Sequence, residues 1–208
     1  HNGTGKTSLV ESMLYYTGAI PKAEAVAGGK TTSDFTEEEL ARKISVHTAL
    51  ASTEWMGKRI NILDTPGTAD FVGEAICSFR TAEAALMLVD ARDGAQIETI
   101  KLWRRLDTRN KPRAVFINKM DKERANSRDV LDNLTEEFHS NFAPVTIPIG
   151  YAEDFKGVIN LIENQAYKFN ANGKEEIIPI PDDMAETVEQ YREELIEKAA
   201  EGADDLIE

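Results

Sequence analysis

The sequence is poor in several residue types, and each shortage excludes a class of protein. One cysteine in 208 residues, Cys77, excludes a disulfide within the chain and suits a reducing compartment. No apolar run approaches the roughly 18 residues that a membrane helix needs. Basic residues are outnumbered by acidic ones, 24 to 37, and the net charge of −13 argues against a segment that binds nucleic acid independently. We therefore expect a compact cytoplasmic domain with no membrane partner, in which the Cys77 thiol, between Ile76 and Phe79, is buried.

A glycine-rich segment at the start of the chain is typical of a phosphate-binding loop. Small residues before Lys6 allow backbone N–H groups to surround phosphate oxygens, Lys6 supplies a positive charge, and the Thr7 hydroxyl can bind Mg²⁺. Taken alone, the same string could be a turn with an exposed lysine. The candidate nucleotide contacts here are Asn2, Gly3, Thr4, Gly5, Lys6, Thr7 and Ser8.

A second motif, Asp64-Thr65-Pro66-Gly67, directly follows the apolar run Ile60-Asn61-Ile62-Leu63. A carboxylate at the tip of a buried strand can hold the Mg²⁺ shell. By itself the motif is an ordinary strand-to-turn sequence, because Pro and Gly are common in turns. All four residues are candidate nucleotide contacts, with Asp64 also a candidate metal ligand.

A third motif, Asn118-Lys119-Met120-Asp121, follows the strand-like run Ala114-Val115-Phe116-Ile117. The Asp121 carboxylate can accept hydrogen bonds from the N1 and N2 donors of guanine. Adenine would leave it unpaired, at a cost of about 1–3 kcal/mol. Asn118, Lys119 and Asp121 are therefore candidate base contacts, although a solvated turn would explain this motif alone. The three motifs in this order predict a site for GTP or GDP with Mg²⁺ and disfavour a P-loop kinase or ATPase.

Hydrophobic periodicity predicts alternating helices and strands over the first 150 residues, which is typical of an α/β fold with a doubly wound, mostly parallel sheet. Together with the three motifs, this pattern predicts a fold of the P-loop GTPase type. A hairpin is expected at Met56-Gly57-Lys58, and residues 19–36 are expected to form a loop. The predicted helices cover residues 8–16, 70–83, 97–109 and 128–138, and the predicted strands cover 60–63, 85–89, 114–117 and 145–149.

The pattern changes after residue 150, where we expect a small inserted α+β subdomain. Asn170-Ala171-Asn172-Gly173 predicts the turn of a hairpin, and a long acidic helix is expected over 183–202 with Val188, Tyr191, Leu195 and Ala199 on one face. Residues 1–150 are thus predicted to form a nucleotide-binding domain, and 151–208 the start of the subdomain. Because the phosphate loop begins at His1, we also expect the first strand of the sheet to precede this sequence.

These motifs, together with two further stretches, resemble elongation factor G and elongation factor G-like proteins, which are translational GTPases. Asp34 to Glu39 with Arg42 to Val46 is similar to the first switch of that family, and Pro148 to Ile159 to the start of its inserted subdomain. The resemblance implies a monomeric, cytoplasmic protein that hydrolyses GTP to GDP and phosphate on the ribosome. It also implies that Mg²⁺ is held by Thr7, Ser45 and Asp64.

Two departures from the family pattern affect hydrolysis more than binding. Gly3 occupies the position of an aspartate in the phosphate loop, and Thr68 that of the catalytic histidine. The candidate catalytic residues are then Lys6 and Thr68, and we expect weak hydrolysis. The alternatives are a module that docks on the ribosome in a GTP-dependent way without catalysis, and a related ribosomal-protection or release factor, in which a histidine would be expected after Gly67.

Overall fold

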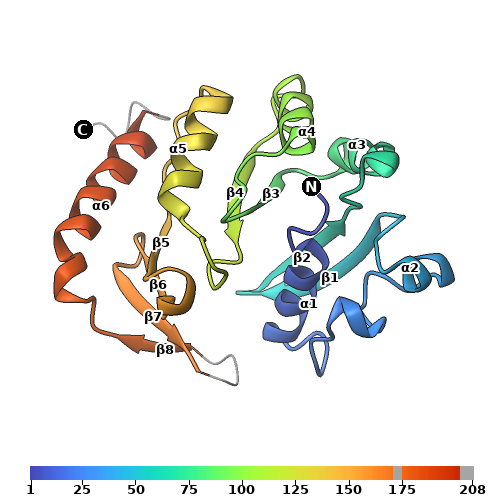
Figure 1. Cartoon of the computed structure of the whole chain (residues 1–208), viewed down its shortest axis with the longest axis horizontal. Helices are drawn as coiled ribbons and strands as arrows, with labels where there is room; N and C mark the ends of the chain where they lie inside the picture. Colours follow the sequence, from blue (N-terminus) through green and yellow to red (C-terminus); the bar gives the residue numbers. More distant parts are fainter. Residues whose placement is uncertain (171–174, 202–208) are drawn as a thin grey trace. The chain divides into compact units, whose positions relative to one another are not determined.

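The computed structural model describes residues 1–170 and 175–201, which fall into two compact units. The first unit comprises residues 1–89 and 96–118, and the second comprises residues 90–95 and the described residues from Lys119 onward. Figure 1 labels their helices and strands. The elements of the first unit are α1 (Lys6–Tyr16), the 3-10 turn η1 (Val26–Gly28), α2 (Glu37–Arg42), β1 (Ala49–Trp55), β2 (Lys58–Asp64), η2 (Ala69–Phe71), α3 (Val72–Thr81), β3 (Ala85–Asp90, its last residue in the second unit), α4 (Ile97–Asp107) and β4 (Arg113–Asn118). From β2 to β4, strands and helices alternate along the first unit.

The second unit combines two long helices with a sheet of short strands. Its elements are α5 (Ser127–Phe138), β5 (Thr146–Ile149), η3 (Ala152–Asp154), β6 (Gly157–Asn160), β7 (Gln165–Phe169), β8 (Glu175–Ile178), η4 (Asp182–Met184) and α6 (Ala185–Ala200). Among the helices of the described residues, none combines the length and apolar character of a membrane-spanning segment.

The predicted hairpin between β1 and β2 is confirmed. The strands are antiparallel, with Trp55 opposite Lys58, and both turn residues, Met56 and Gly57, have positive φ. Such a two-residue turn matches the right-handed twist of the strands. Val10 and Leu14 of α1 pack with Ala51 of β1 in a buried cluster, which seats the helix that follows the phosphate loop against the hairpin.

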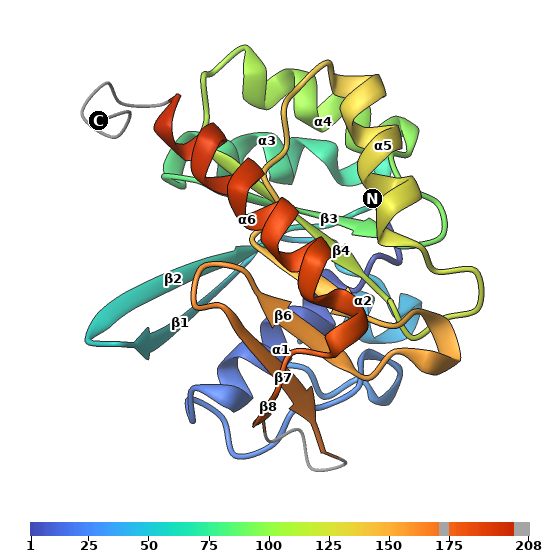
Figure 2. The same cartoon turned by 90° about the vertical axis from the view of Figure 1, so that its left-hand side faces the viewer.

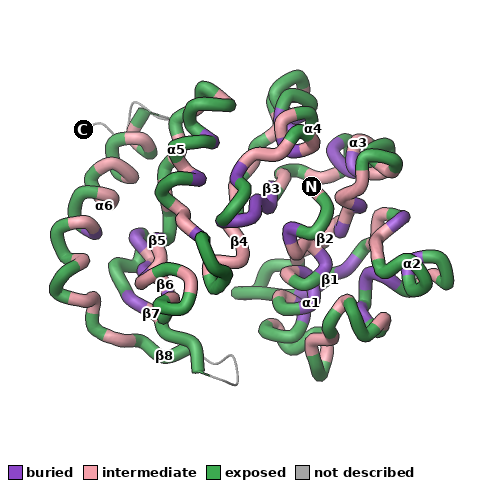
Figure 3. The backbone as a smooth tube through the Cα atoms, viewed as in Figure 1, coloured by how far each residue is buried: buried purple, intermediate pink, exposed green. Residues whose placement is uncertain are grey.

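The central pair of strands, β3 and β4, is hydrogen-bonded and ends in two polar residues, Asp90 and Asn118. The last four residues of β3 are buried, as its unbroken apolar sequence predicts, and they appear in purple in Figure 3. The residues of β4 are half-buried or exposed, so the third motif, which begins at Asn118, is supported by the hydrogen bonds of β4 to the buried strand β3.

One predicted strand belongs to a different sheet from the one expected. β5 does not extend a parallel sheet but pairs antiparallel with β6, in a four-stranded sheet of order β5-β6-β7-β8. The predicted hairpin of β7 and β8 is confirmed, with Phe169 opposite Glu175, while its turn at 171–174 lies outside the described residues. Helix α6 crosses this sheet (Figures 1 and 2), and Val188, Tyr191 and Leu195 pack on its apolar core as the spacing predicts.

The prediction that Cys77 is buried is wrong. Ala75, Ser78 and Phe79 form the buried face of helix α3. Cys77 lies on another face of the helix and is exposed. The neighbours of Cys77 in sequence are apolar, but a helix turns by about 100° per residue, so neighbours do not share a face.

Candidate functional site

The phosphate loop has the geometry of an anion-binding turn at the start of a helix. Gly3 and Gly5 have φ of 75° and 92°, which residues with side chains rarely adopt, and α1 begins at Lys6 directly after them. Asn118 Nδ2 donates a hydrogen bond of 2.8 Å to the Thr4 carbonyl. A Cβ atom at Gly5 would lie 2.5 Å from that same amide nitrogen. The loop therefore needs glycine at position 5, and Asn118 of the third motif holds it in place.

The second motif meets the phosphate loop at Lys6. Lys6 Nζ donates a hydrogen bond of 2.8 Å to the His1 carbonyl. Gly67 approaches so closely that a Cβ atom there would contact Lys6 Nζ and lie 2.8 Å from the Asn2 backbone nitrogen. Burial lowers the pKa of the Lys6 ammonium, and the carboxylates of Asp64 and Asp34 oppose this shift. The positive charge of the Lys6 ammonium is not fully neutralised by these carboxylates, so the site favours an added anion such as phosphate.

Oxygen-bearing side chains lie at the phosphate loop near Lys6. They are Thr7, Ser45, Asp64 and Asp34. Thr7 Oγ1 and Ser45 Oγ are 3.3 Å apart. Asp64 is 3% exposed, and its Oδ2 is buried without a hydrogen-bond partner among the described residues. Burial is the main reason why the pKa of Asp64 is raised, and it outweighs the opposing effects of Thr7, Ser33 and Lys6. Hydroxyl and carboxylate oxygens are the ligands that Mg²⁺ prefers, so these residues fit that ion.

Asp34 is a member of this group that sequence reasoning missed as a site residue. It is buried, its Oδ1 has no hydrogen-bond partner among the described residues, and burial raises the pKa of its carboxyl, partly opposed by the Ser45 hydroxyl. The available signal in the sequence is a single carboxylate directly after the polar run Thr31-Thr32-Ser33. A second buried carboxylate increases the demand of the site for a cation.

Glu39 organises the segment that carries Ser45. It is 2% exposed, and with Thr36 it forms a capping box at the start of α2, a helix that the periodicity did not predict. Its Oε1 accepts hydrogen bonds from the backbone nitrogens of Val46 and His47, at 3.1 and 3.2 Å. Its Oε2 accepts from the Phe35 and Thr36 nitrogens and from the Thr36 hydroxyl. One carboxylate thus joins both ends of the segment 35–47.

We expect Glu39→Gln to destabilise this segment by about 2–3 kcal/mol at neutral pH, because the amide nitrogen cannot accept the bonds made by Oε2. Burial alone would raise the pKa of Glu39, but the hydrogen bonds from Val46, Thr36 and His47 lower it from 4.5 to about 2. The stabilisation is therefore complete above pH 4.5 and is lost as the pH falls toward 2. Amide hydrogen exchange at Val46 and His47 across this range measures it.

Glu38→Gln is the matched control, because Glu38 is exposed and pairs with Arg42 on the surface. The Glu38→Gln substitution should change the stability of the segment by no more than about 0.5 kcal/mol. Equal protection of Val46 and His47 in the two variants would contradict the role given to Glu39.

The third motif continues from Asn118 into a turn. Lys119 has φ of 65°, and its Nζ lies 2.9 Å from Asp90 Oδ2. Asp121 is on the surface, with its side chain 59% exposed and 2.9 Å from Lys122 Nζ. The Asp121 carboxylate can therefore be reached by a base from solvent.

Thr68 directly follows Gly67 and precedes η2, where its carbonyl accepts a hydrogen bond from the Phe71 nitrogen at 3.0 Å. Its side chain is half-buried and makes no capping hydrogen bond. The short side chain provides a hydroxyl and a methyl group at a position where an imidazole would reach further.

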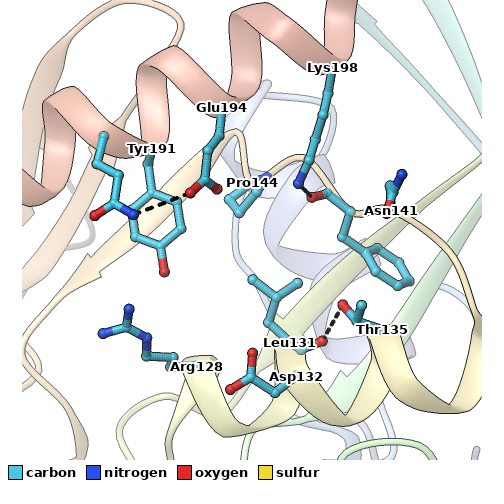
Figure 4. Close-up of a pocket in the computed structure, with 11 residues that line it drawn as sticks. Arg128, Leu131, Asp132, Thr135, Asn141, Pro144, Tyr191, Glu194 and Lys198 are labelled. Carbon is cyan, nitrogen blue, oxygen red and sulfur yellow. Dashed lines mark hydrogen bonds between the residues drawn. The ribbon is translucent and has the colours of Figure 1, made fainter. Parts of the chain in front are cut away.

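A separate surface cavity of about 240 Å³ lies between α5 and α6 (Figure 4). Its lining carries charges of both signs, and Lys198 Nζ is held by the Phe142 carbonyl at 2.6 Å. None of the residues predicted for nucleotide or metal binding lines it. The charged residues around it are Arg128, Asp132, Glu194 and Lys198.

A glycine-rich loop that leads into a helix, a buried lysine and an oxygen cluster for Mg²⁺ together define a P-loop nucleotide-binding domain. Residues 1–205 match the family described as the Elongation factor Tu GTP binding domain, and the chain belongs to that family. A crystal structure of a protein from Thermus thermophilus matches with a TM-score of 0.93 and 33% identity, over 100% of this chain and 31% of that one. The chain thus spans about a third of the length of the protein in that structure.

These findings confirm the predicted α/β fold class and the identification of the chain with the G domain of translational GTPases. The individual site residues remain predictions, with the geometry above as their support.

Proposed function

We propose that this chain is the GTP-binding switch domain of an elongation factor G-like translation factor, which acts as a monomer on the ribosome in the cytoplasm. It binds GTP or GDP with Mg²⁺ and hydrolyses GTP slowly to GDP and phosphate. The observation that carries the proposal is the group of Lys6, Thr7, Ser45 and Asp64 at the phosphate loop, in which Thr7 and Asp64 are buried and Lys6 and Ser45 are half-buried. Contact with ribosomal RNA would depend on other parts of the protein, because this segment carries a net charge of −13.

Each residue type in the group has a distinct task. Backbone N–H groups of residues 2–8 would surround the phosphates, and Lys6 would neutralise their negative charge. Thr7, Ser45 and Asp64 would hold Mg²⁺, which would supply further neutralisation of the phosphate charge. Thr65, Pro66 and Gly67 would place backbone groups near the terminal phosphate, and Asn118, Lys119 and Asp121 would recognise guanine.

The switch would be the segment that carries Ser45. Glu39 closes residues 35–47 into one folded piece, and Glu11 of α1 accepts hydrogen bonds from the Glu24 and Thr32 nitrogens of the loop that precedes it. Because the Ser45 hydroxyl lies beside Thr7, loss of the terminal phosphate and its ion would remove one of the contacts that hold this segment. The bound nucleotide would in this way control a surface that a partner can read.

Thr68 determines how fast the proposed hydrolysis runs. Loss of an imidazole contact to the attacking water typically costs on the order of 10²-fold in rate, while binding is kept. In the intact protein we expect Thr68→Ala to change ribosome-stimulated GTP turnover little and Thr68→His to raise it, with GDP affinity unchanged in both. Turnover measured with and without ribosomes tests this expectation.

The two outcomes of that experiment separate the candidate functions. Slow turnover that ribosomes stimulate supports a weak GTPase, whereas tight GTP binding without turnover supports the docking module that Gly3 and Thr68 favour. A Thr68→Ala variant that loses most of a fast stimulated activity would show that threonine itself is catalytic, and the proposal of weak hydrolysis would fail.

A further inference from the structure

Asp90, the last residue of β3, is a buried carboxylate that contacts the segment proposed to recognise the base. Its side chain is 3% exposed. Arg92 donates from Nε to Oδ1 and from Nη2 to Oδ2, both at 2.8 Å, and Lys119 Nζ donates to Oδ2 at 2.9 Å. The bonds from Arg92, followed by the one from Lys119, hold the pKa of Asp90 well below its usual range. Asp90 is thus a fixed negative charge in direct contact with Lys119.

The turn that begins at Lys119 needs this support. Lys119 is in the left-handed region, which a residue with a long side chain rarely adopts unless its surroundings hold it there. Two backbone hydrogen bonds help, from the Lys122 nitrogen to the Lys119 carbonyl at 3.1 Å and from the Ala152 nitrogen to the Met120 carbonyl at 2.9 Å. The bond to Asp90 is the charged contact among these three. The position of Asp121, two residues further on, depends on all of them.

We propose that Asp90 is a positioning residue for guanine recognition, which holds Lys119 by its ammonium group and so fixes the turn that presents Asp121. The inference rests on the proposed function, because guanine binding is what gives the turn its task. A turn already held in its binding conformation loses less conformational freedom when the base arrives, and the affinity for the base is higher for that reason.

Asp90→Asn tests the role, because the amide nitrogen would face the donors of Arg92 and Lys119 and could not accept from them. In the intact protein we expect the Kd for GDP, measured by calorimetric titration, to rise about 10-fold. Arg92→Gln is the matched control. It also removes bonds to Asp90, but Arg92 lies outside the motif, so the Kd should change by less than about 2-fold while the melting temperature falls as in Asp90→Asn.

A double-mutant cycle separates positioning from a general loss of stability. If Asp90 acts through Lys119, Asp90→Asn should add nothing to the Kd of a Lys119→Met variant. Additive effects on the Kd, or an unchanged Kd in Asp90→Asn, would overturn the inference. If Asp90→Asn does not fold, Asp90→Glu serves in the same cycle, because it keeps the charge but displaces it by one methylene group.

The unmutated protein in the same assay tests the proposed function separately. Failure of that protein to prefer GDP over ADP would refute guanine recognition as a whole, and the inference with it. A clear preference for GDP with no effect of Asp90→Asn would refute the inference alone.

Discussion

Replacement of Asp121 by asparagine is expected to transfer the preference of the intact protein from guanine to xanthine nucleotides. The carboxylate accepts hydrogen bonds from the N1 and N2 donors of guanine, whereas the asparagine amide can donate to the 2-oxo group of xanthine and still accept from N1. A site built for one hydrogen-bond pattern rejects the other strongly, so the affinity for GDP should fall by on the order of 10²-fold or more. Competition of GDP and of XDP with a fluorescent guanine nucleotide for the binding site measures this change of preference.

Glu123→Gln provides the control for charge, because Glu123 is an exposed carboxylate two residues from Asp121. It should leave the preference for GDP over XDP unchanged. If Asp121→Asn lowers the affinities for GDP and XDP equally, Asp121 supports the turn without contacting the base.

Replacement of Lys6 by methionine should reduce the affinity for GDP and GTP by on the order of 10²-fold or more. Methionine keeps the apolar stem but removes an ammonium that is buried beside Asp64 and Asp34 and that would make charge-assisted bonds to the phosphates. Equilibrium binding of both nucleotides to the intact protein, with circular dichroism to show that the variant is folded, measures the loss.

Lys101→Met is the matched control, because Lys101 is an exposed lysine that pairs with Glu98 on the surface of α4. The affinity of the Lys101→Met variant for both nucleotides should stay within about 2-fold of that of the unmutated protein. An equal loss in the two lysine variants would mean that the change reflects overall charge, and the phosphate contact assigned to Lys6 would be wrong.

The motifs and their supporting elements could be predicted from the sequence because their signals are local. A glycine-rich loop before a helix, an apolar run that ends in Asp64 and another that ends in Asn118 are each short, continuous stretches of chain. The structure brings the first two of these together at Lys6 and ties Asn118 to Thr4. The turn at Met56 and Gly57 was predictable for the same reason.

What the sequence could not predict depends on partners distant along the chain. The short β5 sequence Thr-Ile-Pro-Ile fits either kind of sheet, and its pairing with β6 decides which sheet it joins. The links from Asp90 to Lys119 and from Glu39 to Val46 join a carboxylate to a segment that no periodic pattern connects to it. Asp34 could be assigned from the sequence to the switch-like stretch but not to the site, because burial, which local sequence does not report for an acidic residue, is what marks it.

Competition binding of GDP and ADP to the unmutated intact protein, in the presence of Mg²⁺, is the most direct test of guanine recognition by this domain. We expect GDP to displace a bound guanine nucleotide at least about 100-fold more effectively than ADP, because adenine has no hydrogen-bond donors at the positions of guanine N1 and N2 that Asp121 would face. Comparable affinities for GDP and ADP would contradict guanine recognition by Asp121.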